Sequence, residues 1–319
     1  MTTDTSGSKP SLLSTLPKQL PAEFLKDITN GFSPDRKLGQ GAFGTVFKGF
    51  LQDGEPIAVK KLQENSPVAP EKQFKNEVGN LMAIQHGNIV KLVGFCHELQ
   101  KKVIEHSGRY IIVDVVESLL CYEYASNGSL VNHIFENRLD WNTRFKIIKG
   151  ICQGLHFLHK EMDRPIVHLD LQPANILLDD NMVPKIADFG LSRLFGEEQT
   201  RINTLNVVGA KGYMAPEYLY RGEISPRSDI YSLGLLIIEI TTGEKNSSND
   251  QDMSARQFVE KVRQTWTNER IASKYSSLNS DGLQQVKTCI ETGLKCADLD
   301  PKKRPTIVEV LDKLNGRRG

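Results

Sequence analysis

Short apolar runs separated by turn residues dominate the first part of the chain and predict strands. A loop with three glycines, residues 38–46, leads into the apolar run at residues 45–50. Asp53-Gly54 then mark a tight turn before the next run, Ile57-Ala-Val-Lys60. The pattern therefore predicts a glycine loop followed by a β-hairpin.

Apolar positions at helical spacing predict an amphipathic helix over residues 71–83. These positions are Phe74, Val78, Leu81 and Met82. Glu77 lies beside the apolar stripe, where a helix charge ordinarily faces solvent.

A mixed stretch at residues 98–117 interrupts the clear patterns. It is either a surface insertion or an extended hairpin, since Tyr110-Ile-Ile-Val113 has strand character. Residues 119–125 then predict a buried strand that runs into the turn residues Asn127-Gly128.

The remainder of the chain has helical patterns. Asp140 predicts a helix cap before apolar residues at helical intervals. Residues 229–241 are apolar nearly all round and predict a buried central helix. Further helices are expected at residues 255–267, 283–296 and 306–314. Strands followed by helices predict an α+β fold with two lobes and a cleft between them.

Composition and charge narrow the function classes. The 319 residues carry 40 Lys+Arg and 39 Asp+Glu, a net charge of +1, which gives no electrostatic case for nucleic acid. No apolar run reaches the length of a membrane span, and the N-terminus lacks a signal peptide pattern. Five cysteines without CxxC spacing indicate reduced thiols, so a cytoplasmic location is expected.

The strongest chemical signal is the segment His168-Leu-Asp-Leu-Gln-Pro-Ala-Asn175, followed by Asp188-Phe-Gly190. The apolar runs at residues 176–178 and 183–187 predict a hairpin between these two motifs. Such a hairpin holds two carboxylates, Asp170 and Asp188, and the Asn175 amide around one small volume. This arrangement suits binding of Mg²⁺–nucleotide and orientation of a hydroxyl nucleophile.

The glycine loop has two interpretations. A GxGxxG pattern alone also fits a dinucleotide-binding turn, which requires a helix directly afterwards. The predicted strands that follow it favour a lid over nucleotide phosphates instead.

These motifs, in this order, resemble those of eukaryotic protein kinases, and Ala215-Pro-Glu217 with Arg304 adds to the resemblance. Residues 28–33 resemble the segment before the glycine loop in plant receptor-like Ser/Thr kinases, including the cytoplasmic class. The resemblance implies the bilobal kinase fold, with a β-rich N-lobe at about 21–124, a hinge at about 123–128 and a helical C-lobe at about 129–319. Residues 1–20, rich in Ser, Thr, Pro and Lys, are expected to be a disordered lead.

The resemblance also implies the roles of individual residues. Asp170 would be the catalytic carboxylate, Lys60 would bind phosphates while paired with Glu77, and Asn175 with Asp188 would bind the metal. The residues implied around ATP are Leu38, Gly39, Gly41, Gly44, Val46, Ala58, Lys60, Tyr122 as gatekeeper, Glu123, Ala125 and Leu177. The cofactors implied are ATP and Mg²⁺, with Mn²⁺ as an alternative metal.

Three positions depart from the family pattern. Leu169 replaces the Arg that usually precedes the catalytic Asp, which removes a regulatory contact but no catalytic atom. Gln172 replaces the Lys that Ser/Thr kinases place on the γ-phosphate. Ala210 replaces a Thr whose hydroxyl contacts the same Lys and Asp.

Three hypotheses follow. The first is a Ser/Thr protein kinase in plant receptor-like or immune-type signalling, acting on protein substrates below an upstream receptor. The second is an ATP-binding pseudokinase or scaffold, which Gln172 and Ala210 favour. A small-molecule kinase is disfavoured, because the Ala-Pro-Glu segment and the helical C-lobe resemble enzymes with protein substrates.

Overall fold

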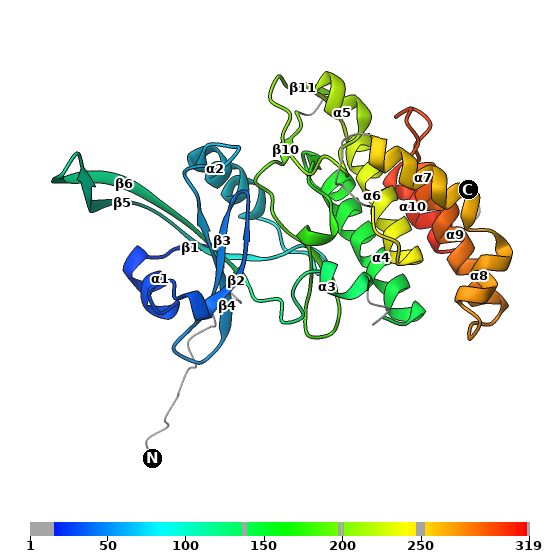
Figure 1. Ribbon diagram of the computed structural model, residues 1–319, viewed down its shortest axis with the longest axis horizontal. Helices are drawn as coiled ribbons and strands as arrows, with labels where there is room; N and C mark the ends of the chain where they lie inside the picture. The colour runs from blue at the N-terminus through cyan, green and yellow to red at the C-terminus, as the bar shows by residue number, and fades with distance from the viewer. Residues whose placement is uncertain (1–15, 136–138, 197–198, 200, 247–252, 318–319) are drawn as a thin grey trace, which may run out of the picture. The chain divides into compact units, whose positions relative to one another are not determined.

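The computed structural model describes residues 16–135, 139–196, 199, 201–246 and 253–317 (Figure 1). The chain forms two compact units. The first comprises residues 1–84 and 91–124, and the second comprises residues 85–90 and 125–319. Residues 85–90 therefore belong to the second unit, although the residues on either side of them belong to the first.

A six-stranded sheet with the order β1-β5-β6-β4-β3-β2 forms the first unit. Its strands are β1 (Lys18–Gln19), β2 (Lys37–Gly41), β3 (Gly44–Phe50), β4 (Pro56–Leu62), β5 (Leu92–His106) and β6 (Arg109–Glu123). The hairpin predicted around Asp53-Gly54 is confirmed, and Gly54 turns the chain with a φ of 85°. The first unit also contains the helices α1 (Ala22–Ile28) and α2 (Pro70–Leu81) and the short turn η2 (Pro34–Arg36).

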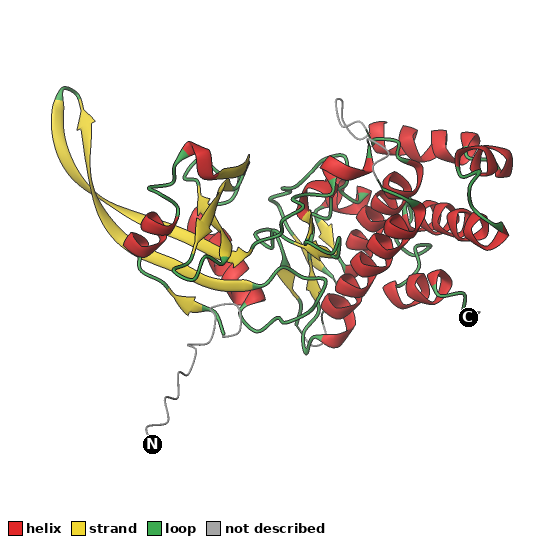
Figure 2. Cartoon of the chain, turned by 90° about the horizontal axis from the view of Figure 1, so that it is seen from below, coloured by secondary structure: helices red, strands yellow, loops and turns green. Residues whose placement is uncertain are grey.

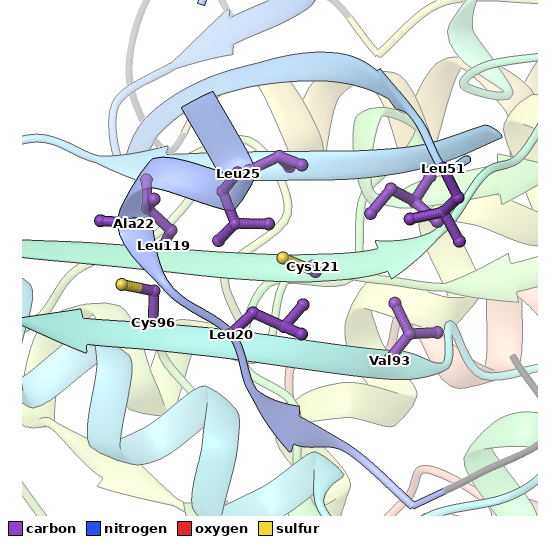
Figure 3. Packing of buried hydrophobic residues seen from close by; sticks show 10 residues of the cluster. Leu20, Ala22, Leu25, Leu51, Val93, Cys96, Leu119 and Cys121 are labelled. Carbon is purple, nitrogen blue, oxygen red and sulfur yellow. The ribbon is translucent and has the colours of Figure 1, made fainter. Parts of the chain in front are cut away.

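One face of this sheet is covered by the segment that precedes the kinase-like motifs. Lys18 and Gln19 pair in parallel with β5, and Leu20 and Leu25 are buried against the sheet. Figure 3 shows these leucines beside Cys96 and the neighbouring apolar residues of β5 and β6. The sequence analysis predicted that residues 1–20 are disordered. Residues 1–15 lie outside the described residues, and the prediction is wrong for residues 16–20. A short strand pairing and one buried leucine hold that part of the chain in place.

Helix α2 differs from its expected apolar stripe. Met82 follows the last helical residue and is 41% exposed, so it does not belong to the buried face. The buried residues are instead Gln73, Phe74, Glu77 and Leu81. Two polar side chains therefore lie on the face that packs, and their hydrogen bonds are part of the candidate site.

Strands β5 and β6 form an extended hairpin, one of the two alternatives that the sequence left open for residues 98–117. Their pairing runs without a break from Gly94↔Cys121 to His106↔Arg109. Both figures show this two-stranded ribbon continuing past the rest of the sheet (Figures 1 and 2).

The second unit is mainly helical (Figure 2). Its helices are α3 (Val131–Ile134), α4 (Trp141–His156), α5 (Pro216–Arg221), α6 (Pro226–Thr242), α7 (Met253–Thr265), α8 (Asn268–Lys274), α9 (Ser280–Cys296) and α10 (Ile307–Leu314). It also contains the π-helix η3 (Phe157–Glu161) and the 3-10 helix η4 (Pro173–Asn175). Its strands are β7 (Ile166–Val167), β8 (Ile176–Leu178), β9 (Pro184–Ile186), β10 (Arg193–Leu194), β11 (Ile202–Asn203) and β12 (Glu223–Ile224). Asp140 caps α4 by accepting a hydrogen bond from the Thr143 N–H at 2.8 Å, as predicted.

Helix α6 is the predicted buried central helix, because every residue from Ser228 to Thr242 is buried. It packs chiefly against α9, with α4 as a second neighbour. Despite this apolar character, none of the helices in the described residues is both long and apolar enough to span a bilayer.

One buried acid in α6 makes the stability of this unit depend on pH. Burial raises the pKa of Glu239 from 4.5 to about 7, although Tyr213 Oη and the Asn246 N–H donate hydrogen bonds to its carboxylate. The unfolded chain releases this proton near its ordinary pKa, so unfolding becomes easier as pH rises from about 4.5 to 7. This one group is expected to remove about 3 kcal/mol from the free energy of unfolding across that window.

Glu239→Gln keeps the size and hydrogen-bonding capacity of the side chain but has no proton to release. Urea unfolding at pH 5 and pH 7.5 should show a smaller pH-dependent loss for this variant than for the native chain. Equal losses in the two proteins would contradict the assignment.

Candidate active site

Lys60 on β4 and Glu77 on α2 form the ion pair that the resemblance implies. Lys60 Nζ lies 2.8 Å from Glu77 Oε1, and both side chains are buried. Gln73 Nε2 donates to the same carboxylate oxygen at 3.0 Å, and the Tyr122 hydroxyl donates to Oε2. Three donors therefore satisfy the oxygens of the fully buried Glu77 side chain.

The glycine loop lies on β2, β3 and their connection. Gly39 is paired with Val46, and Gly41 with Gly44, while Leu38 is 45% exposed. A side chain at Gly44 would collide with a backbone oxygen of β4, so packing explains this glycine. A side chain at Gly39 or Gly41 would meet nothing within 4 Å, so packing does not require these two. They leave the backbone open to a ligand.

The residues expected around adenine fall in both units. In the first unit, Ala58 on β4 is paired with Tyr122 on β6, and Glu123 ends β6. In the second unit, Ala125 is buried and Leu177 lies on β8.

Asp229 of the central helix α6 holds the segment that carries Asp170. Its Oδ2 accepts a hydrogen bond from the His168 N–H, and its Oδ1 accepts one from the Leu169 N–H, both at 2.8 Å. Leu169 has a φ of 69°, a left-handed conformation that is strained for leucine. Leu169, which replaces the Arg of the family pattern, is therefore a buried apolar residue with a strained backbone. Its hydrogen bond to Asp229 of α6 holds that backbone in place.

The Asp170 carboxylate is the centre of a hydrogen-bond network. Gln172 Nε2 lies 3.1 and 3.2 Å from its two oxygens, and Asn175 Nδ2 lies 2.7 Å from Oδ2. The Ala210 N–H donates to Oδ1 at 3.1 Å. Both family departures, Gln172 and Ala210, thus contact Asp170 directly, one through its side-chain amide and the other through its backbone.

Asp170 and Asp188 are close enough to affect each other. Burial raises the pKa of Asp170, and the negative charge of Asp188 raises it further. Asp188 has a φ of 67°, so its backbone is also left-handed at this point.

The donor set fits a small divalent cation. Asn175 donates its Nδ2 to Asp170, so its amide oxygen is left as a potential ligand, and Asp188 would supply a carboxylate. The described residues contain no group of three or more His, Cys, Asp or Glu placed to hold a metal alone. Mg²⁺ needs only one or two protein oxygens, because waters and substrate phosphates complete its coordination.

Glu217 and Arg304 form a buried ion pair in the second unit. Arg304 Nη1 and Nη2 each lie 2.7 Å from one oxygen of Glu217, so the contact is bidentate. Arg304 also donates to the carbonyl oxygens of Asp298 and Arg227, at 2.7 and 2.8 Å. The pair fixes the start of α5 against the segment before α10.

Sequence reasoning missed two residues, Gln73 and Asp229, that hold the candidate residues or their segment in place. It did not assign Gln73 to Glu77, although a spacing of four residues on one helix is the available signal. It also treated residues 229–241 as an apolar helix and overlooked Asp229, whose acidic side chain within that helix is itself a signal.

Comparison with known proteins agrees with these motifs. The sequence profile of the protein kinase domain matches residues 32–314. Cysteine-rich receptor-like protein kinase 10 of Arabidopsis thaliana is 40% identical over 299 residues, which is 92% of this chain and 42% of that protein. Cysteine-rich receptor-like protein kinases 8 and 5 of the same plant are each 41% identical, over 92% and 93% of this chain.

This chain spans about two fifths of the length of these curated relatives. Use of ATP and a divalent metal is general in the family whose profile it matches. The chain belongs to the protein kinase family, and within that family it is similar to the plant receptor-like kinases.

Proposed function

We propose that the chain is a Ser/Thr protein kinase that transfers the γ-phosphate of Mg-ATP to hydroxyl groups of protein substrates. Asp170 orients the substrate hydroxyl and accepts its proton, while Asn175 and Asp188 bind Mg²⁺. Bound Mg²⁺ neutralises charge on the phosphates. The proposal places this activity in the cytoplasm, in plant receptor-like signalling below an upstream receptor.

One observation carries the proposal: the Asp170 carboxylate is buried and aimed by donors from Gln172, Asn175 and Ala210. A carboxylate fixed in this way accepts a hydroxyl proton without first having to reorganise. The raised pKa of Asp170 brings its basicity closer to neutral pH, where proton transfer in the transition state is more effective.

The first unit supplies the proposed contacts to the phosphates, and residues of both units supply those to adenine. Lys60, held by Glu77, binds the α- and β-phosphates, and the open backbone at Gly39 and Gly41 covers the phosphates. The proposed adenine contacts are Leu38, Val46, Ala58, Tyr122, Leu177, the Glu123 carbonyl and the Ala125 amide.

The proposed preference for serine and threonine substrates is based on the segments near Asp170. Pro173 and residues 209–213 resemble those of Ser/Thr kinases more than those of Tyr kinases. Phosphotransfer from labelled ATP to a mixed protein substrate, with phosphosites located by mass spectrometry, tests this proposal. Serine and threonine phosphosites support it, and phosphotyrosine alone would overturn it.

A second candidate is an ATP-binding pseudokinase. Gln172 and Ala210 favour it, since no cation stands at position 172 and no hydroxyl at position 210. The same phosphotransfer assay separates the two candidates: nucleotide binding without any transferred label supports the pseudokinase.

Nucleotide binding is the first expected outcome. Mg-ATP at about one hundred times its dissociation constant should stabilise the native fold by about 2.7 kcal/mol, because only the folded state binds it. Thermal unfolding with and without Mg-ATP measures the shift. Lys60→Met should reduce the shift at equal nucleotide concentration, and an unchanged melting temperature for the native chain would refute nucleotide binding.

Gln172→Lys is expected to raise the rate of phosphotransfer. A cation near the transferred phosphoryl group stabilises the charge that its oxygens share in the transition state. The neutral amide at position 172 provides less of this stabilisation than a cation would. Removing one such donor from an active site lowers the rate by about 10²–10³-fold. Adding Ala210→Thr should raise the rate by more than the two single effects combined, because its hydroxyl would brace the new cation.

Single-turnover phosphotransfer at saturating Mg-ATP is the measurement for the native chain, both single variants and the double variant. Asn181→Lys is the matched control, since it adds the same charge in the exposed turn between β8 and β9. A gain in this control equal to that of Gln172→Lys would show that net charge, and not position 172, determines the rate.

A further inference from the structure

The outer part of the β5–β6 hairpin has no neighbouring strand. Strand β4 pairs with β6 only as far as Leu119, and β1 pairs with β5 only at Gly94 and Phe95. Within the described residues, the segment 99–116 therefore pairs only with itself, and both of its edges are open (Figures 1 and 2).

This ribbon exposes large apolar side chains on one face. Cross-strand partners share a face, so Leu99 with Val116, and Val103 with Ile112, lie on the same side as Tyr110. These five side chains are 50–77% exposed. A two-stranded ribbon without a packed face is only marginally stable in water, and an open strand edge is a template for another strand.

The charges on β5 identify which strand fits the open edge. Lys101 and Glu105 lie on the same face as Val103 and are placed symmetrically, two residues on either side of it. If a second copy of β5 runs antiparallel with its Val103 opposite this one, each Lys101 lies opposite the other copy's Glu105. Opposite charges at directly facing positions stabilise strand pairing.

On β6, the position that corresponds to Val103 is its cross-strand partner Ile112, and the strand lacks this charge symmetry about it. The positions equivalent about Ile112 are Tyr110 and Asp114, which do not complement each other in a self-pairing. Lysine on an exposed edge ordinarily opposes pairing, but on β5 the Glu105 of the second copy would neutralise Lys101.

We propose that two copies of this chain associate through the outer edges of β5, about a two-fold axis at Val103, to form a continuous four-stranded ribbon. The interface is isologous, so it closes as a dimer and does not propagate into fibres. Because β5 ends at His106, the two-fold at Val103 allows only Gln100–His106 of each copy to pair. The dimer interface is therefore small, and the dimer population depends on protein concentration.

The first experiment measures the dimer dissociation constant of the native chain by sedimentation over a range of concentrations. Glu105→Lys places like charges opposite Lys101 twice in the two-fold interface. It should weaken the dimer about tenfold or more. Lys102→Glu is the matched control, because Lys102 lies on the other face and would stand opposite Ile104 of the second copy. It should leave the dissociation constant within about threefold of the native value.

A charge exchange tests the register itself. Lys101→Glu combined with Asp114→Lys keeps opposite charges within each hairpin, since these residues face each other, but should also weaken the homodimer. Mixing this double variant with Glu105→Lys makes both intermolecular pairs complementary again, so a heterodimer of native affinity should form.

Circular dichroism and thermal unfolding check that each variant is folded. A native chain that stays monomeric at the highest concentrations, a dimer insensitive to Glu105→Lys, or a mixture that does not associate would each overturn the proposal.

Discussion

Asp170→Asn is expected to lower the rate of phosphotransfer by about 10²–10⁴-fold, the usual contribution of a positioned general base. Asparagine has nearly the same shape as aspartate but cannot accept the substrate proton. Its amide nitrogen would also face a donor, since Gln172 Nε2 contacts both oxygens of the native carboxylate. Single-turnover transfer from labelled ATP measures the loss.

Two controls separate lost chemistry from a lost fold. The thermal shift produced by Mg-ATP should persist in Asp170→Asn, because Lys60 and the glycine loop are unchanged. Asp180→Asn makes the same chemical change in the exposed turn of the β8–β9 hairpin and should keep the native rate. Full activity in Asp170→Asn would show that another group takes the proton, or that the measured activity comes from a contaminating kinase.

Arg304→Met is expected to destabilise the second unit by about 3–5 kcal/mol, the cost of removing one partner from a buried ion pair. The substitution keeps an apolar stem but leaves Glu217 buried without its bidentate partner. It also removes the donors that Arg304 supplies to the carbonyls of Asp298 and Arg227. Urea unfolding measures the loss as a lower transition midpoint.

Lys313→Met is the matched control, because Lys313 pairs with Glu291 at 3.5 Å on the surface. A pair exposed to water contributes about 0–1 kcal/mol, so this variant should unfold nearly as the native chain does. If the two variants lost the same stability, the Glu217–Arg304 pair would not have the importance that its burial indicates.

The sequence predicted those elements whose hydrophobic period or capping residue lies within one short segment of the chain. The β8–β9 hairpin, the Asp140 cap and the buried helix α6 all follow from turn chemistry or periodicity within one segment. Helices α5 and α8 were not predicted. They have only six and seven residues, too few for a clear helical period.

Contacts between segments limited the prediction of the candidate site. Motif order brought Asp170, Asn175 and Lys60 into consideration, but spacing along the chain could not indicate which donors hold a carboxylate. The sequence analysis assigned no partner to Gln73 or to the Tyr122 hydroxyl. When α2 packs on the sheet, both side chains donate hydrogen bonds to Glu77. A pattern of neighbouring residues cannot predict such a contact between segments.

The hydrogen bonds that Asp229 accepts also link the motion of the segment carrying Asp170 to global unfolding. The amide hydrogens of His168 and Leu169 point at a carboxylate on the most deeply buried helix of the second unit. Solvent reaches such hydrogens only when that helix separates from its neighbours, so their exchange with deuterium should report the rarest openings of the unit. The segment that carries Asp170 has an irregular backbone, but its residues are buried and its exchange behaviour should be that of the core.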